Sequence, residues 1–290
     1  MQAVFIDFTK AFDTVSREEL WLVLRRFGCT EKVINLIKAL HNGMQAKVVQ
    51  GSEASDQLAV TNDVKQGCVL APTLFSLFLT AMPDVAFRNV KEGIYIQTRS
   101  GVSHLKSKTC TTKHLVRKML FADDNALVAQ GASKMQLLVD RFARAAAQFS
   151  PKINIRKTEC LYQPVKLLQS QPEPEVITIN QEPLVLATSF TYLGSTVSSN
   201  AKLEEELRNR LGKANKAFGN LCQRLWNNRH VSIRAKCKVY RVVVLSTLLS
   251  AAEVWTIYRT EVKKLHANIM RQLRELWILN GMARSTMMKS

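Results

Sequence analysis

The sequence lacks the patterns of a zinc-binding, a secreted or a membrane-spanning protein. Its six cysteines include no CxxC pair and no histidine at zinc-ligand spacing, which favours reduced intracellular thiols. No signal peptide precedes the first apolar run, so we expect an intracellular protein. The apolar run 242–249 is too short to span a bilayer, and we expect no membrane partner.

Acidic residues are absent from a long part of the C-terminal third. No Asp or Glu occurs between residues 207 and 252. Residues 200–290 hold 18 Lys and Arg against 6 Asp and Glu, so two thirds of the net charge of +18 lies there. A merely solvated helical surface usually mixes both signs, and this alternative stays open. The excess favours a face that binds the phosphates of a polyanion.

Periodicity predicts a mixed set of helices and strands in a chain long enough for one large or two small domains. We expect helices at 16–27, 33–40, 72–85, 133–148, 201–226, 232–249 and 261–279. Short strands are expected at 46–49, 57–60, 93–98, 176–179 and 184–187. In the second helix, Val33, Leu36, Ile37 and Leu40 are expected to point inward. Ser16 and Ser133 are expected to cap the helices that follow them.

Two adjacent carboxylates, Asp123 and Asp124, lie between the apolar segments 119–121 and 126–128. This pattern predicts two buried strands that meet at a tight turn made by Asp123, Asp124 and Asn125. Carboxylates at such a tip repel one another and are costly to desolvate, and a divalent cation would offset both effects. An Asp-Asp turn that points into solvent is the alternative.

A third carboxylate, Asp7, follows a continuous apolar run that is typical of a strand covered on both faces. An ion pair with Lys10 is the simple explanation for an acid at this place. Two-metal phosphoryl transfer instead needs carboxylates from separate elements that converge on two cations roughly 4 Å apart. Magnesium suits such a site because it takes few protein carboxylates and keeps room for water and phosphate oxygens.

Five segments resemble, in order, the polymerase motifs of non-LTR (LINE-type) retrotransposon reverse transcriptases. Residues 4–13, 64–72 and 121–124 resemble motifs A, B and C, residues 153–158 resemble motif D, and residues 190–195 resemble the motif E primer grip. The basic helices after them resemble the family's thumb. Asp63 and Ser150 depart from the family pattern, which often has glycine at these places.

The resemblance implies an α+β fold in two domains. Residues 1–195 would form a polymerase palm, an antiparallel sheet with helices packed on one face, and residues 196–290 a basic, all-α thumb-like bundle. The implied activity is RNA-directed DNA polymerase, with two Mg²⁺ ions, an RNA template, a DNA primer and deoxynucleoside triphosphates. The family's fingers and endonuclease precede motif A, so we expect a truncated copy. A non-catalytic nucleic-acid-binding relic of a retroelement is the alternative.

The resemblance also implies roles for single residues. Asp7, Asp123 and Asp124 would be catalytic and would bind the metals. Nucleotide binding would fall to Phe8, Phe12, Gln66, Gly67 and Lys157, and the primer grip to Tyr192, Leu193 and Gly194. Phe12 would exclude a ribose 2′-hydroxyl and Lys157 would assist the leaving pyrophosphate. The alternatives are that Phe12 and Tyr192 are plain core and that Lys157 is an ordinary surface lysine.

The basic helices are expected to contact nucleic-acid phosphates without reading bases. The candidate residues are Arg208, Lys213, Lys216, Arg224, Arg234 and Lys238. Arg210 and Lys236 are expected on the same basic faces. A polymerase needs contacts of this kind because it must accept any template sequence.

Overall fold

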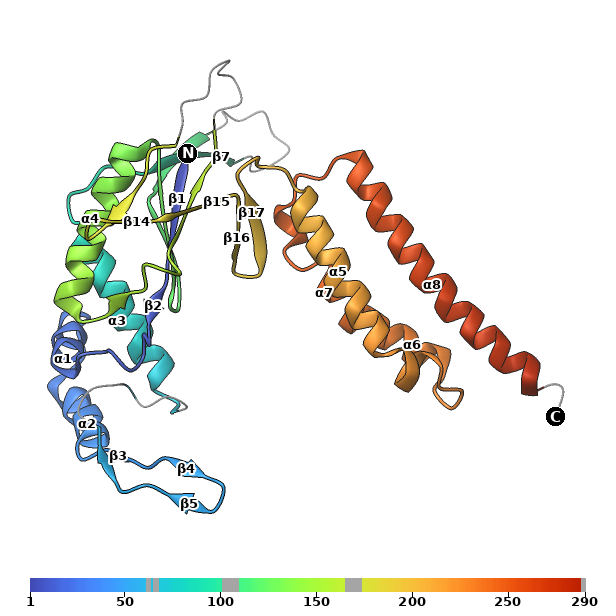
Figure 1. The fold of residues 1–290 in the computed structure, drawn as a ribbon, viewed down its shortest axis with the longest axis horizontal. Coiled ribbons are helices and arrows are strands. Elements are labelled where there is room, and N and C mark those ends of the chain that lie inside the picture. The colour runs from blue at the N-terminus through green and yellow to red at the C-terminus, as the bar shows by residue number, and fades with distance from the viewer. Residues whose placement is uncertain (61–63, 65–67, 101–109, 165–173, 288–290) are drawn as a thin grey trace. The chain divides into compact units, whose positions relative to one another are not determined.

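The computed structural model describes residues 1–60, 64, 68–100, 110–164 and 174–287 (Figure 1). It divides into two compact units, Met1–Phe190 and Thr191–Ser290. Helices and strands are both abundant and the expected α+β class is confirmed. The division falls five residues before the expected boundary, so residues 191–195 group with the helical unit and not with the sheet.

The centre of the first unit is a five-stranded sheet in the order β15-β12-β1-β10-β9 (Figure 1). Its strands are β1 (Gln2–Ile6), β9 (Lys118–Phe121), β10 (Asp124–Ala129), β12 (Glu159–Tyr162) and β15 (Val185–Ala187). β1 lies in the middle and runs antiparallel to β10 and β12. β15 pairs parallel with β12, so the expected antiparallel sheet is mixed at this edge.

Two helices, α3 (Ala71–Ala86) and α4 (Ala132–Phe149), pack on one face of this sheet, as expected (Figure 1). Val4 and Ile6 of β1 join the hydrophobic core that these helices share. Successive strand side chains point to opposite faces, so Phe5 faces the other way and stacks on Phe190 at 4.0 Å between ring centroids.

The first two helices differ in how well the sequence predicts their buried side. In α1 (Arg17–Arg26), Ser16 accepts a hydrogen bond from the Glu19 backbone N–H at 3.4 Å, which confirms the N-cap. In α2 (Glu31–His41), Ile34 and Ile37 are buried. The expected inward residues Val33, Leu36 and Leu40 are exposed, so that prediction is wrong for three of four positions. Apolar residues occupy two stripes of this helix, and periodicity alone does not choose between them.

Several short hairpins complete the first unit. β3 (Gln45–Ala46) pairs with β6 (Leu58–Ala59), and β4 (Val49–Gln50) pairs with β5 (Glu53–Ala54) around a turn at Gly51 and Ser52. β7 (Ile94–Ser100) pairs with β8 (Cys110–Val116), and β13 (Thr178–Ile179) pairs with β14 (Glu182–Pro183). β2 (Phe8–Thr9) pairs with β11 (Lys152–Ile153), which brings motif D to the end of motif A.

Both ends of α4 differ from expectation. The helix begins after Gly131, without a side-chain cap, so the predicted Ser133 cap is wrong. Ser150 ends the helix in the left-handed conformation with φ 77°. This conformation costs an L-residue about 1–2 kcal/mol and is the one that glycine usually occupies. Ser150 therefore keeps the chain path of a glycine stop at a steric cost.

The second unit is a hairpin followed by helices. β16 (Ser189–Tyr192), which starts in the first unit, pairs with β17 (Ser195–Ser198). The helical elements are α5 (Glu204–Asn220), a π-helical turn (Cys222–Trp226), α6 (Ile233–Val239), a second π-helical turn (Tyr240–Leu245), α7 (Ser246–Leu248), a 3-10 turn (Ala252–Val254) and α8 (Arg259–Met287). Leu207, Ala214 and Phe218 of α5 are buried in the core of this unit, as their spacing predicts. Across the described residues, no helix has both the length and the apolar character that a membrane crossing needs.

Candidate active site

The three acids singled out from the sequence lie at one end of the central strand pair. β1 ends at Ile6, which pairs with Asn125 of β10, so Asp7 directly follows β1 at the end of the strand pair where β10 begins with Asp124. The charges of Asp7 and Asp123 both act on the Asp124 carboxyl group, which places the three acids near one another. Asp123 precedes Asp124 in the turn between β9 and β10. The structure therefore brings Asp7, Asp123 and Asp124 together from two separate elements.

The turn itself is built differently from the prediction. Ala122 is its left-handed residue, with φ 52°, whereas Asp124 and Asn125 are already part of β10. The Asn125 side chain donates a hydrogen bond to the Asp123 backbone oxygen at 2.8 Å. Positive φ is uncommon for alanine, and strained backbone of this kind is often found at functional sites.

Negative charge is crowded at this end of the sheet. The pKa of Asp124 is raised above its ordinary value, first by partial burial of its carboxyl group, although the residue as a whole is exposed, and then by the charges of Asp123 and Asp7. Asp7 Oδ2 and Asn125 Oδ1 are buried, and neither has a hydrogen-bond partner among the described residues. A carboxylate oxygen is costly to bury without a hydrogen-bond partner, so the arrangement favours a cation beside Asp7.

The carboxylates of Asp7, Asp123 and Asp124 are chemically suited to bind a divalent cation, but their side chains are not oriented to bind one together. Carboxylate oxygens are the ligands that magnesium takes, and the buried Asp7 oxygen would gain a partner. In the part of the chain that the structure describes, no three His, Cys, Asp or Glu side chains are positioned to hold an ion as they stand. Binding would require the exposed Asp123 and Asp124 side chains to turn toward Asp7.

The backbone of Asp7 is held from both sides by motif D. The Asp7 N–H donates to Thr158 Oγ1 at 3.3 Å, and the Asn154 N–H donates to the Asp7 carbonyl at 2.8 Å. Thr158, which is fully buried, donates in turn to the Asn154 carbonyl at 2.9 Å. Thr158 is therefore a positioning residue for Asp7. The sequence predicts no role for Thr158 beyond its place in the motif D segment, because a buried threonine leaves no pattern of its own.

Lys157 and not Lys10 forms the ion pair of Asp7, so the alternative explanation of Asp7 by an ion pair with Lys10 is wrong. The Lys157 Nζ atom lies 3.9 Å from Asp7 Oδ2, and its side chain is 72% exposed. Lys10 sits in the turn after β2 with φ 48°. A contact this long and this exposed is weak, which leaves Lys157 able to reach another anion.

The nucleotide-binding candidates are placed to different degrees. Phe8 is buried and stacks on Phe142 at 6.1 Å between ring centroids. Phe12 is half-buried and stacks on Phe75 of α3 at 3.8 Å. Phe12 therefore packs against the core, but as a half-buried residue it is also partly accessible to solvent. Gln66, Gly67 and Asp63 lie outside the described residues.

The predicted primer grip is a tight hairpin in the second unit. Leu193 and Gly194 connect β16 to β17 with φ 49° and 81°. Positive φ at both central residues is the geometry of a type I′ turn, which matches the twist of the flanking strands. Leu193 is exposed and Tyr192 is half-buried. The tip of the hairpin is therefore presented to solvent.

The six candidate phosphate-binding residues are all exposed: Arg208, Lys213, Lys216, Arg224, Arg234 and Lys238. Two other basic residues expected beside them are buried, so their predicted place is wrong. Arg210 is 6% exposed and pairs with Glu206. Lys236 is 2% exposed and donates to the Trp226 carbonyl at 2.7 Å. Each is inside because a partner within the second unit satisfies its charge or its donors.

Comparison with known families agrees with this arrangement. The family model described as "Reverse transcriptase (RNA-dependent DNA polymerase)" matches residues 2–197. The chain belongs to the reverse transcriptase family. The resemblance found in the sequence is thereby confirmed.

Three curated relatives come from mobile elements. The RNA-directed DNA polymerase from mobile element jockey of Drosophila funebris is 24% identical over 94% of this chain. The Pol polyprotein from type-2 retrotransposable element R2DM of Drosophila melanogaster is 23% identical over 69% of it. A Pol polyprotein from a type-1 retrotransposable element R2 of Popillia japonica is 33% identical over 26%. The chain spans 28%, 16% and 12% of these relatives, respectively.

Solved telomerase structures are also similar to this chain. A telomerase from Candida albicans aligns with 97% of this chain and 44% of its own at 11% identity, with a TM-score of 0.43. A telomerase from Candida tropicalis aligns over the same shares at 10% identity, with a TM-score of 0.44.

Proposed function

We propose that this chain carries the polymerase centre for RNA-templated DNA synthesis, with Asp7, Asp123 and Asp124 as ligands of two Mg²⁺ ions. The observation that carries the proposal is that Asp7 follows β1 at the same end of the strand pair where Asp123 and Asp124 enter β10. The raised pKa of Asp124 supports it, because the charges of Asp123 and Asp7 contribute to the shift and a bound cation would offset this repulsion.

The chemistry divides between the ions and the protein. When bound, two magnesium ions lower the pKa of a primer 3′-hydroxyl and neutralise the triphosphate. The three carboxylates hold the ions, and the contacts of Thr158 and Asn154 fix the backbone of Asp7. Lys157, exposed and 3.9 Å from Asp7, is poised to neutralise the leaving pyrophosphate.

The partners of this site are an RNA template, a DNA primer and deoxynucleoside triphosphates. Phe12 is the candidate for excluding a ribose 2′-hydroxyl, since its half-buried ring is held rigidly by Phe75. The Leu193–Gly194 turn would contact the primer backbone. The six exposed basic residues of the second unit would contact phosphates of the duplex, which predicts strongly salt-dependent binding.

The rest of the machinery would come from a longer protein. The chain spans 28% of the jockey relative, so most of a protein of that kind lies outside it. Fingers that clamp the triphosphate and an endonuclease are the regions we propose to be supplied there. The proposal therefore assigns the palm and thumb functions to these 290 residues.

Primer extension on an RNA template tests the proposal. With a fingers region supplied in trans and Mg²⁺ present, labelled DNA is expected to grow with the wild-type chain and not with Asp123→Asn. Asp56→Asn is the matched control, because Asp56 is an exposed acid on the β3–β6 hairpin. Salt-sensitive binding of nucleic acid without extension by the wild type, with fingers added in trans, would contradict the proposal and support the non-catalytic relic.

A further inference from the structure

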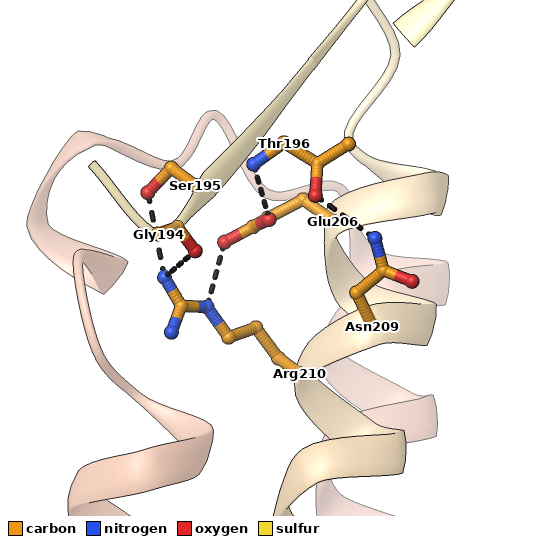
Figure 2. A network of polar contacts seen from close by, with 6 residues as sticks. All are labelled: Gly194, Ser195, Thr196, Glu206, Asn209 and Arg210. Carbon is orange, nitrogen blue, oxygen red and sulfur yellow. Dashed lines mark hydrogen bonds and ion pairs between the residues drawn. The ribbon is translucent and has the colours of Figure 1, made fainter. Parts of the chain in front are cut away.

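A buried ion pair stands directly behind the turn that is proposed to contact the primer. Figure 2 shows Glu206 and Arg210, which are four residues apart on α5 and therefore share one face of the helix. Their side chains are 3% and 7% exposed, and Arg210 Nε donates to Glu206 Oε1 at 2.7 Å. The pair has little access to water, so its geometry is set by the groups around it.

Both members of the pair also bind the hairpin. Arg210 Nη2 donates to the Gly194 carbonyl at 2.8 Å and to Ser195 Oγ at 3.4 Å. Glu206 Oε2 accepts from the Thr196 backbone N–H at 2.6 Å. Three successive residues of the hairpin are thus fastened to one helical turn, beginning at the left-handed Gly194 (Figure 2).

A third side chain on the same face of α5 completes the attachment. Asn209 Nδ2 donates to Thr196 Oγ1 at 2.9 Å. Glu206, Asn209 and Arg210 therefore hold backbone and side-chain groups of the turn and of β17 (Figure 2). Leu193, at the tip of the hairpin, is exposed. Such a support fixes where the tip points without covering it.

We propose that Glu206 and Arg210 are positioning residues for the Leu193–Gly194 turn and set where the primer 3′ end lies. Arg210 does not act as a phosphate ligand, because it is buried and its Nε and Nη2 atoms donate inside the protein. Glu206 is the last acid before the acid-free stretch 207–252, and its charge is compensated by Arg210, so it does not weaken the basic surface. The inference rests on the proposed polymerase function.

The test compares two arginines on one helix. Arg210→Lys keeps the positive charge beside Glu206 but removes the planar fork that reaches two sites at once. Arg208→Ala is the matched control, because Arg208 is exposed and two residues away. Duplex affinity is measured against salt, and primer positioning by the fluorescence of 2-aminopurine at the primer 3′ end at saturating protein.

Opposite patterns are expected for the two variants. Arg208→Ala should lower the salt slope of binding by about 1 and leave the saturated fluorescence unchanged. Arg210→Lys should leave the salt slope unchanged, shift the saturated fluorescence, and slow extension by up to about 100-fold, as a small displacement of the reacting ends does. A salt slope lowered by Arg210→Lys, or an unchanged fluorescence, would overturn the inference.

A measurement that needs no turnover separates this inference from the polymerase proposal. Hydrogen exchange at the Thr196 amide reports its bond to Glu206 directly. Exchange should accelerate by a factor of ten or more in Glu206→Ala and stay slow in Arg208→Ala. Failure of the wild type to extend a primer, with the exchange and fluorescence shifts intact, would contradict the polymerase proposal alone. Unchanged exchange in Glu206→Ala would overturn the positioning role.

Discussion

The two polar clusters of the molecule treat charge in opposite ways. At the end of β1 and β10, three carboxylates stand together, and the pKa of Asp124 is raised by burial and by its neighbours. On α5, Glu206 is buried to a greater extent, yet Arg210 and the Thr196 N–H satisfy it. The carboxylates of the first cluster remain available to a ligand, whereas the charges of Glu206 and Arg210 are used to hold the hairpin. The presence of partner groups, more than the degree of burial, therefore distinguishes a binding site from a structural ion pair.

The largest effect is expected when one carboxylate of the first cluster is removed. Asp123→Asn should slow primer extension by a factor on the order of 10³ or more, since a lost metal ligand removes several kcal/mol of transition-state stabilisation. Extension rates at saturating nucleotide measure it. The thermal stability of Asp123→Asn should stay at the wild-type value or rise, because the variant relieves repulsion. Loss of folding together with activity would assign Asp123 a structural role.

Breaking the Glu206–Arg210 pair should lower the free energy of unfolding. Arg210→Ala leaves Glu206 buried without its cation, which typically costs about 3–5 kcal/mol. Chemical denaturation of the helical unit, followed by circular dichroism, measures the free energy of unfolding. Arg208→Ala should change it by less than about 0.5 kcal/mol. Equal effects of the two variants would remove the distinction between the buried and the exposed arginine.

A smaller effect is expected when the contacts that position Asp7 in the first cluster are removed. Thr158→Val removes the hydroxyl that accepts from the Asp7 N–H and donates to the Asn154 carbonyl. Loss of these partners should cost about 1–3 kcal/mol of stability and lower extension as well. Thr158→Ser keeps the hydroxyl and should retain most of both. If Thr158→Val extends primers at the wild-type rate, the backbone of Asp7 is fixed by other contacts.

The smallest expected effect is the pH dependence of stability at Asp124. Its pKa in the folded chain is raised above the ordinary value of 3.8, so the folded state holds this proton more tightly than the unfolded state. The favourable contribution is full below pH 3.8 and is lost as pH rises through the raised value. Asp124→Asn should therefore be more stable than wild type at pH 7, by no more than about 1 kcal/mol because water screens exposed carboxylates.

Thermal melting across pH 3 to 7 measures this difference. The stabilisation by Asp124→Asn should shrink toward zero at the acid end. Asp56→Asn, at an exposed acid on the β3–β6 hairpin, should show no such trend. A gain from Asp124→Asn that is constant across this range would contradict the crowding of charge around Asp124.

The sequence predicts the fold best where pattern and packing agree. The apolar run before Asp7 and the apolar segments around Asp123 and Asp124 predict the positions of β1, β9 and β10, and the spacing in α5 predicts its buried stripe. The expected burial is confirmed for β10 and is wrong for β9, where Met119 and Phe121 are exposed. In α2 the pattern fails, because two apolar stripes compete and only tertiary contacts select Ile34 and Ile37.

The supporting contacts of the site are harder to obtain from sequence. Thr158, Arg210 and Lys236 are polar residues whose burial depends on partners brought near by the fold. Charge pattern alone grouped Arg210 and Lys236 with the exposed bases of the second unit. Ala122 was missed as well, since its left-handed backbone is imposed by the β9–β10 pairing and not by its own preference.

Manganese binding followed by electron paramagnetic resonance tests the central claim most directly. The wild-type chain is titrated with Mn²⁺ in the presence of an RNA template, a DNA primer and a non-hydrolysable deoxynucleotide. The account predicts two bound ions per chain in the wild type and in Asp56→Asn, and the loss of at least one in Asp7→Asn and in Asp123→Asn. Equal binding by the wild type and Asp123→Asn would show that the three acids do not share a pair of ions.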